Sequence, residues 1–274
     1  MDAARDYSLS TSPKYRSFLF YGPPGSGKTW ASMDIFPSLN KFVIDTDNKL
    51  AMSLECHPRL AEITRLTQVF TPTHRLSEDA IGFSTVEAVK KGDVPATVKG
   101  TVPKNAKGYM EIVNFLNNDL STLIQEHNVE VVVLDTLSAI SDHLIYRILE
   151  THMKSSMTLP LWGIYRNNLN EFVKGFLGLP CHRIVCAHTN VREDEVTKEV
   201  HVRPSIMGSY RDDIAKEFVE AWHFEGLRGS DYMVRTAGTS KYMARTAKKL
   251  EPIAKLSDVL KNFDGHEEKR CAAD

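Results

Sequence analysis

The chain has 274 residues, 42% of them hydrophobic and 25% charged, and a formal net charge of −1 at pH 7. It has no apolar run long enough to span a bilayer and no signal-peptide core, so we expect a cytoplasmic protein with no membrane partner. With a net charge near zero, any nucleic-acid binding has to come from a local basic patch.

The first predicted elements surround a glycine-rich loop. A polar lead-in, residues 1–16, precedes an apolar run of strand length at 17–21, and residues 30–36 have a helical pattern that Pro37 ends. Between them, residues 22–29 read Gly-Pro-Pro-Gly-Ser-Gly-Lys-Thr, which completes the phosphate-loop pattern G-x-x-x-x-G-K-[ST]. Strand, loop and helix follow in the order that a nucleotide site requires.

Each part of this loop has an expected role. The glycines let backbone N–H groups point at a triphosphate, Lys28 reaches the β- and γ-phosphates, and Thr29 binds Mg²⁺. The alternative is a surface turn of glycine and proline between two core elements. The residues expected to contact the nucleotide are Gly22, Pro23, Pro24, Gly25, Ser26, Gly27, Lys28 and Thr29.

A second short strand, predicted at 41–45, ends in the sequence Asp45-Thr46-Asp47. Because open α/β sheets bind ligands beyond the carboxyl ends of their strands, Asp47 is a candidate for the carboxylate that orients an attacking water. A solvated Asp-Thr-Asp-Asn turn explains the same residues equally well.

A further strand is predicted near 66–70, and residues 85–108 then interrupt the pattern. This lysine-rich stretch holds five lysines and two acidic residues, a net charge of +3 (five minus two). We interpret it as an insertion loop that could contact a nucleic-acid backbone. A solvated loop is the alternative.

The next elements carry the second nucleotide motif. Apolar residues at helical spacing predict a helix over 111–126, and the β-branched run 129–135 predicts a strand that is buried on both faces. This strand ends at Asp135, a Walker B carboxylate expected to hold Mg²⁺ together with Thr29. Thr136 follows, not glutamate, so the catalytic base has to come from elsewhere.

Later elements supply three further candidates. A helix over 163–177 leads into a strand at 183–187, after which His188 could sense the γ-phosphate or be an ordinary surface residue. Residues 191–208 indicate a hairpin or mobile loop. Beyond a strand at 231–236, a basic cluster contains Lys241 and Arg245, which could reach a neighbouring subunit's nucleotide or form a solvated face.

Alternating strand and helix signals predict an α/β fold with a doubly wound, mostly parallel sheet flanked by helices and with C-terminal β-hairpin elements. We expect the core to span 17–250 and residues 251–274 to form a tail.

From about Ser17 to Lys249 the chain resembles the small RecA-like P-loop ATPases of bacteriophages, some of which act as single-strand annealing recombination proteins. Seven segments carry the resemblance: 21–29, 44–47, 133–139, 162–163, 184–188, 203–208 and the late Thr236…Lys241…Arg245.

The resemblance implies ATP and Mg²⁺ as cofactors and host cytoplasm as the location if the protein is phage-encoded. It makes Asp47 the catalytic carboxylate, where RecA-type recombinases usually have glutamate, and His188 the γ-phosphate sensor. It also implies contact of 191–208 with single-stranded DNA. Lys241 and Arg245 would act in trans within a ring or filament.

These features favour an ATPase that binds single-stranded DNA as an oligomer in recombination, annealing or repair, with a single-strand-binding protein as a possible partner. One alternative is a small-molecule or nucleoside kinase on a P-loop scaffold. Another is a nucleotide-switched partner such as a helicase loader.

Overall fold

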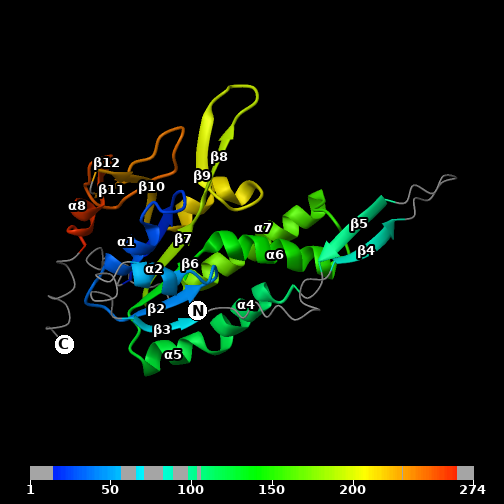
Figure 1. Cartoon of the computed structure of the whole chain (residues 1–274), viewed down its shortest axis with the longest axis horizontal. Helices are drawn as coiled ribbons and strands as arrows, with labels where there is room; N and C mark the ends of the chain where they lie inside the picture. Colours follow the sequence, from blue (N-terminus) through cyan, green and yellow to red (C-terminus); the bar gives the residue numbers. More distant parts are fainter. Residues whose placement is uncertain are drawn as a thin grey trace, which may run out of the picture.

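A central sheet of eight strands organises the protein (Figure 1). The computed structural model describes residues 15–56, 66–70, 83–88, 98–103, 106–229 and 231–263. The strands of the central sheet are β1 (Ser17–Tyr21), β2 (Lys41–Asp45), β3 (Leu66–Phe70), β6 (Val131–Asp135), β7 (His182–Ala187), β10 (Glu220–Arg228), β11 (Asp231–Arg235) and β12 (Ile253–Lys255).

The strand order is β12-β11-β10-β1-β7-β6-β2-β3. The six strands from β10 to β3 run parallel, whereas β11 is antiparallel to β10 and β12 to β11. The expected α/β fold, with a mostly parallel sheet and C-terminal hairpin elements, is therefore confirmed. Strand β7 lies between β1, which precedes the glycine-rich loop, and β6, which ends at Asp135.

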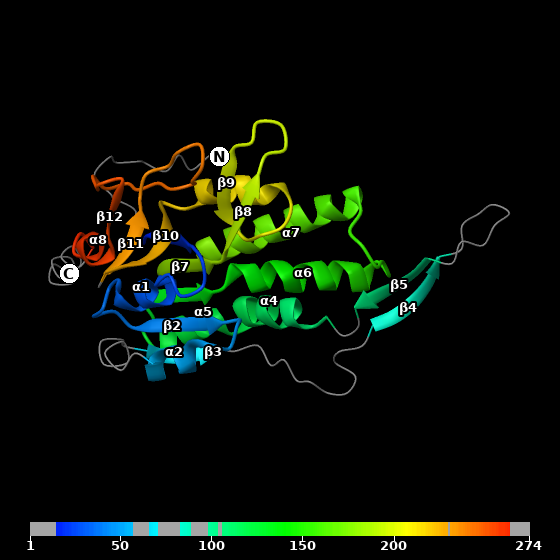
Figure 2. The same ribbon diagram turned by 45° about the horizontal axis from the view of Figure 1, so that its top comes forward.

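Helices cover both faces of the sheet (Figure 2). Alternate residues of each strand face opposite sides, so Leu19 and Tyr21 join one apolar cluster while Phe18 and Phe20 join the other. The first cluster packs against α4 (Gly108–Asn118), α5 (Leu120–Glu126), α6 (Leu137–Thr151) and α7 (Leu159–Leu177). The second packs against α1 (Lys28–Asp34), the start of α2 (Leu50–Cys56) and α8 (Leu256–Leu260).

Two hairpins extend from this body in both views (Figures 1 and 2). Strands β4 (Phe83–Ala88) and β5 (Val98–Pro103) pair in the lysine-rich stretch and project beyond α6 and α7; residues 89–97 of that stretch lie outside the described residues. Strands β8 (Thr189–Glu193) and β9 (Val200–Pro204) form the other hairpin, followed by the short 3₁₀ helices η1 (Ser209–Asp212) and η2 (Ile214–Glu217).

The last described residues differ from the tail that we expected at 251–274. Strand β12 pairs with β11, and Leu256, Val259, Leu260 and Phe263 are buried against the sheet. These side chains recur at helical spacing, so α8 presents one apolar face to the core. Residues 264–274 lie outside the described part of the chain, as do residues 1–14 of the lead-in.

Candidate nucleotide site

The glycine-rich loop joins β1 to α1 and is held partly by its own lysine. Lys28 Nζ donates hydrogen bonds to the carbonyl oxygens of Gly22 at 3.0 Å and Pro23 at 2.8 Å. Burial lowers the pKa of Lys28, while Cys186, Asp135 and Asp47 oppose that shift. The lysine is thus kept beside the loop, within a cavity that also contains acidic side chains.

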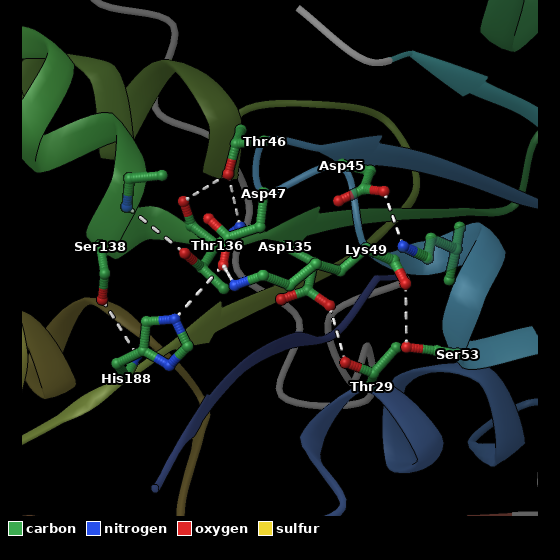
Figure 3. A network of polar contacts seen from close by, with 12 residues as sticks. Thr29, Asp45, Thr46, Asp47, Lys49, Ser53, Asp135, Thr136, Ser138 and His188 are labelled. Atoms are coloured by element: carbon green, nitrogen blue, oxygen red, sulfur yellow. Dashed lines mark hydrogen bonds and ion pairs between the residues drawn. The ribbon is translucent and has the colours of Figure 1, made fainter. Parts of the chain in front are cut away.

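Thr29 and Asp135 meet at the carboxyl end of β6 (Figure 3). Thr29 Oγ1 donates to Asp135 Oδ2 at 2.8 Å. Burial raises the pKa of Asp135, and the Thr29 hydrogen bond and the Lys28 charge counteract it. A divalent cation would replace the hydroxyl proton as the partner of this carboxylate.

These two oxygens fit Mg²⁺. Magnesium is commonly bound by one or two protein oxygens and completes its shell with water and substrate phosphate. Within the described ranges, no cluster of three or more His, Cys, Asp or Glu side chains could cage a metal. One carboxylate and one hydroxyl beside a phosphate loop are therefore a donor set for a magnesium that arrives with a nucleotide.

Hydrogen bonds of Thr46 join the end of β2 to the end of β6 (Figure 3). Its backbone N–H donates to the carbonyl oxygen of Asp135 at 2.7 Å. Its hydroxyl accepts from the N–H of Thr136 at 2.7 Å and donates to the carbonyl oxygen of Thr136 at 3.0 Å. Asp45 next to it is buried, and its Oδ2 accepts from the N–H of Leu50 at 2.8 Å, so this carboxylate supports α2.

Asp47, which directly follows Thr46, points toward His188 (Figure 3). Its Oδ2 lies 3.3 Å from His188 Nε2 and 3.3 Å from Lys49 Nζ. The hydrogen bond with His188 lowers the pKa of Asp47, burial opposes this, and Lys49 adds to the lowering. Asp47 is therefore held ionised. Burial and the charge of Asp47 raise the pKa of Asp142, which lies on α6.

His188 is fixed through its backbone as well. Its N–H donates to Ser138 Oγ at 2.9 Å, and its carbonyl oxygen accepts from the N–H of Ser205 at 2.7 Å. Its Nδ1 is buried and has no hydrogen-bond partner among the described residues. Because His188 directly follows β7 and Ser205 follows β9, the base of the β8–β9 hairpin adjoins the cavity.

A single cavity of about 220 Å³ brings most of the predicted site residues together. Gly22 and Pro23 are outside its lining and serve as acceptors for Lys28. Sequence reasoning missed several lining residues, and of these Tyr232 is placed there by the sheet order. The predicted residues in the lining are Pro24, Gly25, Ser26, Gly27, Lys28, Thr29, Asp47, Asp135 and His188; those we missed include Trp30, Lys49, Leu50, Ser53 and Tyr232.

A family profile described as an AAA domain matches residues 14–246. The chain belongs to this AAA domain family. With its intact phosphate loop, this AAA domain is a P-loop NTPase.

Comparison with solved structures finds proteins that share little sequence with this AAA domain. One is described as a prototypical ATPase from the type III secretion system of pathogenic bacteria, with 8% identity, 76% of this chain and 51% of that chain covered, and a TM-score of 0.43. Another is an ATP synthase subunit of Nanoarcheaum equitans, with 10% identity, 77% and 45% covered, and a TM-score of 0.42. The domain thus spans about half the length of each. A comparison with curated proteins gives no match.

Lys241 and Arg245 lie outside the cavity of this AAA domain. Arg245 forms a β-bridge with Ala221 and donates from Nη1 to the carbonyl oxygen of Lys216 at 3.3 Å. Lys241 Nζ lies 5.3 Å from the centre of the Tyr242 ring. Both basic residues are exposed, and neither completes the site of its own chain.

A second cavity, of about 500 Å³, lies between the β8–β9 hairpin and η1. The strand register places Asn190 opposite Arg203 and Arg192 opposite His201, so these four side chains share the hairpin face that lines the cavity. Arg211 of η1 lies on the other side. In the described part of this AAA domain, no helix is both long and apolar enough to cross a bilayer.

Proposed function

We propose that this protein binds and hydrolyses ATP with Mg²⁺ and uses the nucleotide to control its binding to single-stranded DNA. It would act as an oligomer in recombination, annealing or repair, as RecA-like ATPases of bacteriophages do, in the cytoplasm of a host cell. The proposal rests mainly on one observation. A single cavity at the carboxyl ends of adjacent parallel strands is lined by Lys28, Thr29, Asp47, Asp135 and His188.

The side chains divide the work of hydrolysis among them. Lys28 neutralises the β- and γ-phosphates, while Thr29 and Asp135 hold Mg²⁺, which supplies charge stabilisation at the phosphates. Asp47 is ionised and lines the same cavity, so it can orient the attacking water. His188 already bonds to Asp47 and is placed to exchange that partner for the γ-phosphate.

The cavity beside the β8–β9 hairpin supports binding of a phosphate backbone. Arg192, His201 and Arg203 face this groove from the hairpin, and Arg211 faces it from η1. Over residues 189–204 the hairpin has a net charge of −1 (three basic minus four acidic residues). Glu193, Asp194, Glu195 and Asp212 also line this groove and repel phosphate, so we propose that the DNA strand contacts its arginine side.

Nucleotide state would reach this groove through His188. Its carbonyl bonds to Ser205 below the hairpin, and its side chain faces the γ-phosphate end of the cavity. Ordering of the hairpin base by ATP, and its release on hydrolysis, is the switch that we infer.

Oligomer formation is the part of the proposal that concerns Lys241 and Arg245. Since both are exposed and lie outside their own cavity, they are available to the nucleotide site of a neighbouring copy in a ring or filament. A single-strand-binding protein is a further proposed partner on the same DNA.

A nucleotide-switched partner, such as a helicase loader, is the second candidate function. It is favoured by the state of Asp47, whose carboxylate is one methylene shorter than glutamate and is already bonded by His188 and Lys49. A slow base suits a switch that holds ATP. A small-molecule kinase is disfavoured because, among the described residues, no arginine lines the nucleotide cavity, whereas such enzymes usually close an arginine-rich lid.

ATP hydrolysis by the purified protein, with and without single-stranded DNA, tests the proposal. We expect Mg²⁺-dependent turnover that single strands stimulate and that Lys28→Ala abolishes. Tight ATP binding with negligible turnover at any DNA concentration would favour the switch. Turnover that DNA does not change would remove the DNA part of the proposal.

A further inference from the structure

The ring of Tyr232 lies directly on the phosphate loop. A Cβ atom built on Gly27 would come 2.7 Å from Cγ and 2.9 Å from Cδ1 and Cδ2 of this ring. Because the contact is made at the Cγ end, the outer part of the ring and its hydroxyl extend past the loop. Tyr232 also lines the nucleotide cavity, although it is 204 residues from Lys28 in the sequence (232 minus 28).

The surrounding structure fixes this tyrosine in place. Its strand, β11, is paired on both sides, with Leu227 of β10 opposite Tyr232 and β12 on the other edge. The N–H of Tyr232 donates to Asp231 Oδ1 at 2.8 Å, and Asp231 Oδ2 accepts from Ser257 Oγ at 2.5 Å. Among the described residues, the Tyr232 hydroxyl has no hydrogen-bond partner, so the ring is rigidly held while its polar end remains available.

The polarity of the cavity indicates which part of a nucleotide Tyr232 would meet. Thr29 and Asp135 mark the magnesium and γ-phosphate end, and Asp47 and His188 lie on the same side. The nucleoside has to leave the loop away from these charged groups. Its base needs a flat apolar surface, and the aromatic side chains of the lining are Trp30 and Tyr232.

The size of the cavity places the base at the rim. Its volume of about 220 Å³ is below the roughly 300–1,000 Å³ of pockets that enclose a whole ligand. The triphosphate and its cation fill such a space, and the base then lies outside it. An aromatic side chain that is half-buried beside the loop is suited to hold a base at this position.

We propose that Tyr232 is the base-contacting residue of this site and that the nucleobase stacks on its outer ring. The inference rests on the nucleotide site proposed above and adds the residue that recognises the nucleoside. Stacking tolerates every base because each has a π-face, so this contact by itself gives affinity for nucleosides and little discrimination between ATP and GTP.

Calorimetric titration with Mg·ATP, Mg·GTP and Mg·tripolyphosphate tests the proposal, because tripolyphosphate has the phosphates and lacks the base. Stacking on an aromatic side chain corresponds to about 5- to 150-fold in affinity by alanine substitution. Tyr232→Ala should therefore weaken ATP and GTP binding by about this factor and leave tripolyphosphate binding unchanged. Tyr232→Phe should bind all three ligands nearly as the wild type does.

Tyr146→Ala is the matched control, because this exposed tyrosine lies on α6 and outside the cavity. Equal losses for ATP and tripolyphosphate in Tyr232→Ala would show that the ring only supports the loop and would overturn the inference. Unchanged ATP affinity in Tyr232→Ala would overturn it as well. If the wild type binds tripolyphosphate as tightly as ATP, the base contact is refuted and the nucleotide site stands. A wild type that binds neither ligand would refute the nucleotide site itself.

Discussion

Replacing Thr46 by valine should destabilise the protein through the loss of one buried hydroxyl. Thr46 is 3% exposed, and its hydroxyl serves both the N–H and the carbonyl of Thr136. Valine keeps the shape and removes both bonds. The Thr136 N–H is then buried without a partner, which costs about 1–3 kcal/mol. The Thr136 carbonyl keeps the Ile140 N–H at 3.5 Å, so its loss is smaller.

We therefore expect Thr46→Val to lower the free energy of unfolding by about 2–3 kcal/mol. Thr46→Ser is the matched control, because serine keeps the hydroxyl and loses one buried methyl group, at about 1 kcal/mol. Urea unfolding with linear extrapolation measures both variants. The valine variant should also bind Mg·ATP more weakly, since Thr46 joins the strand ends that hold Asp47 and Asp135.

The relative stabilities of the two variants show whether the Thr46 hydroxyl or its methyl group matters. If Thr46→Val is within about 0.5 kcal/mol of the wild type while Thr46→Ser is less stable than it, packing of the methyl group matters and the hydroxyl does not. The idea that this side chain links β2 to β6 would then be wrong.

Three further predictions concern charge. Burial lowers the pKa of His223 from 6.5 to about 4, so the unfolded chain takes up a proton between these values that the native chain does not. Native stability should fall by up to about 3 kcal/mol as the pH drops through this window, and urea unfolding of His223→Gln should lack this loss. His188→Ala removes the largest cause of the lowered pKa of Asp47. In the wild type, ionised Asp47 stabilises the native state above its unfolded pKa, and this stabilisation is lost as the pH falls through its lower folded pKa. In His188→Ala, the difference in the free energy of unfolding between pH 7 and pH 3 should therefore be smaller. Arg192→Ala should weaken single-stranded DNA binding and reduce its salt slope by about one, measured by anisotropy, whereas Lys198→Ala at the hairpin tip should not.

The sequence predicted the parts of the site that lie next to a motif in the chain. The glycine-rich loop and the strand that ends at Asp135 are each marked by a continuous local pattern, and both are where we expected them. Asp47 was equally compatible with a solvated turn. Its partners could not be foreseen, because the contact with His188 joins residues 141 positions apart (188 minus 47).

Periodicity was less informative about where elements begin and end. The helix expected over 111–126 is two helices, α4 and α5, that meet at Asp119. Both keep the apolar spacing, so the pattern is the same with or without the break. The tail expected after 250 contains β12 and α8, because three strand residues and one helical turn are too short for a periodic signal.

Strand order explains what the local signals could not. The strand ends that form the cavity lie in the order β1, β7, β6, β2, so the glycine-rich loop, His188, Asp135 and Asp47 are neighbours at one edge of the sheet. Because β7 lies between β1 and β6, His188 adjoins both the phosphate loop and the carboxylates. The β8–β9 hairpin begins at the next residue, Thr189. A group at the end of any other strand would meet the nucleotide without being joined to that hairpin. On the other side of β1, β10 brings β11 and Tyr232 against Gly27. The two neighbours of β1 thus place the candidate phosphate sensor and the proposed base contact on opposite sides of one loop.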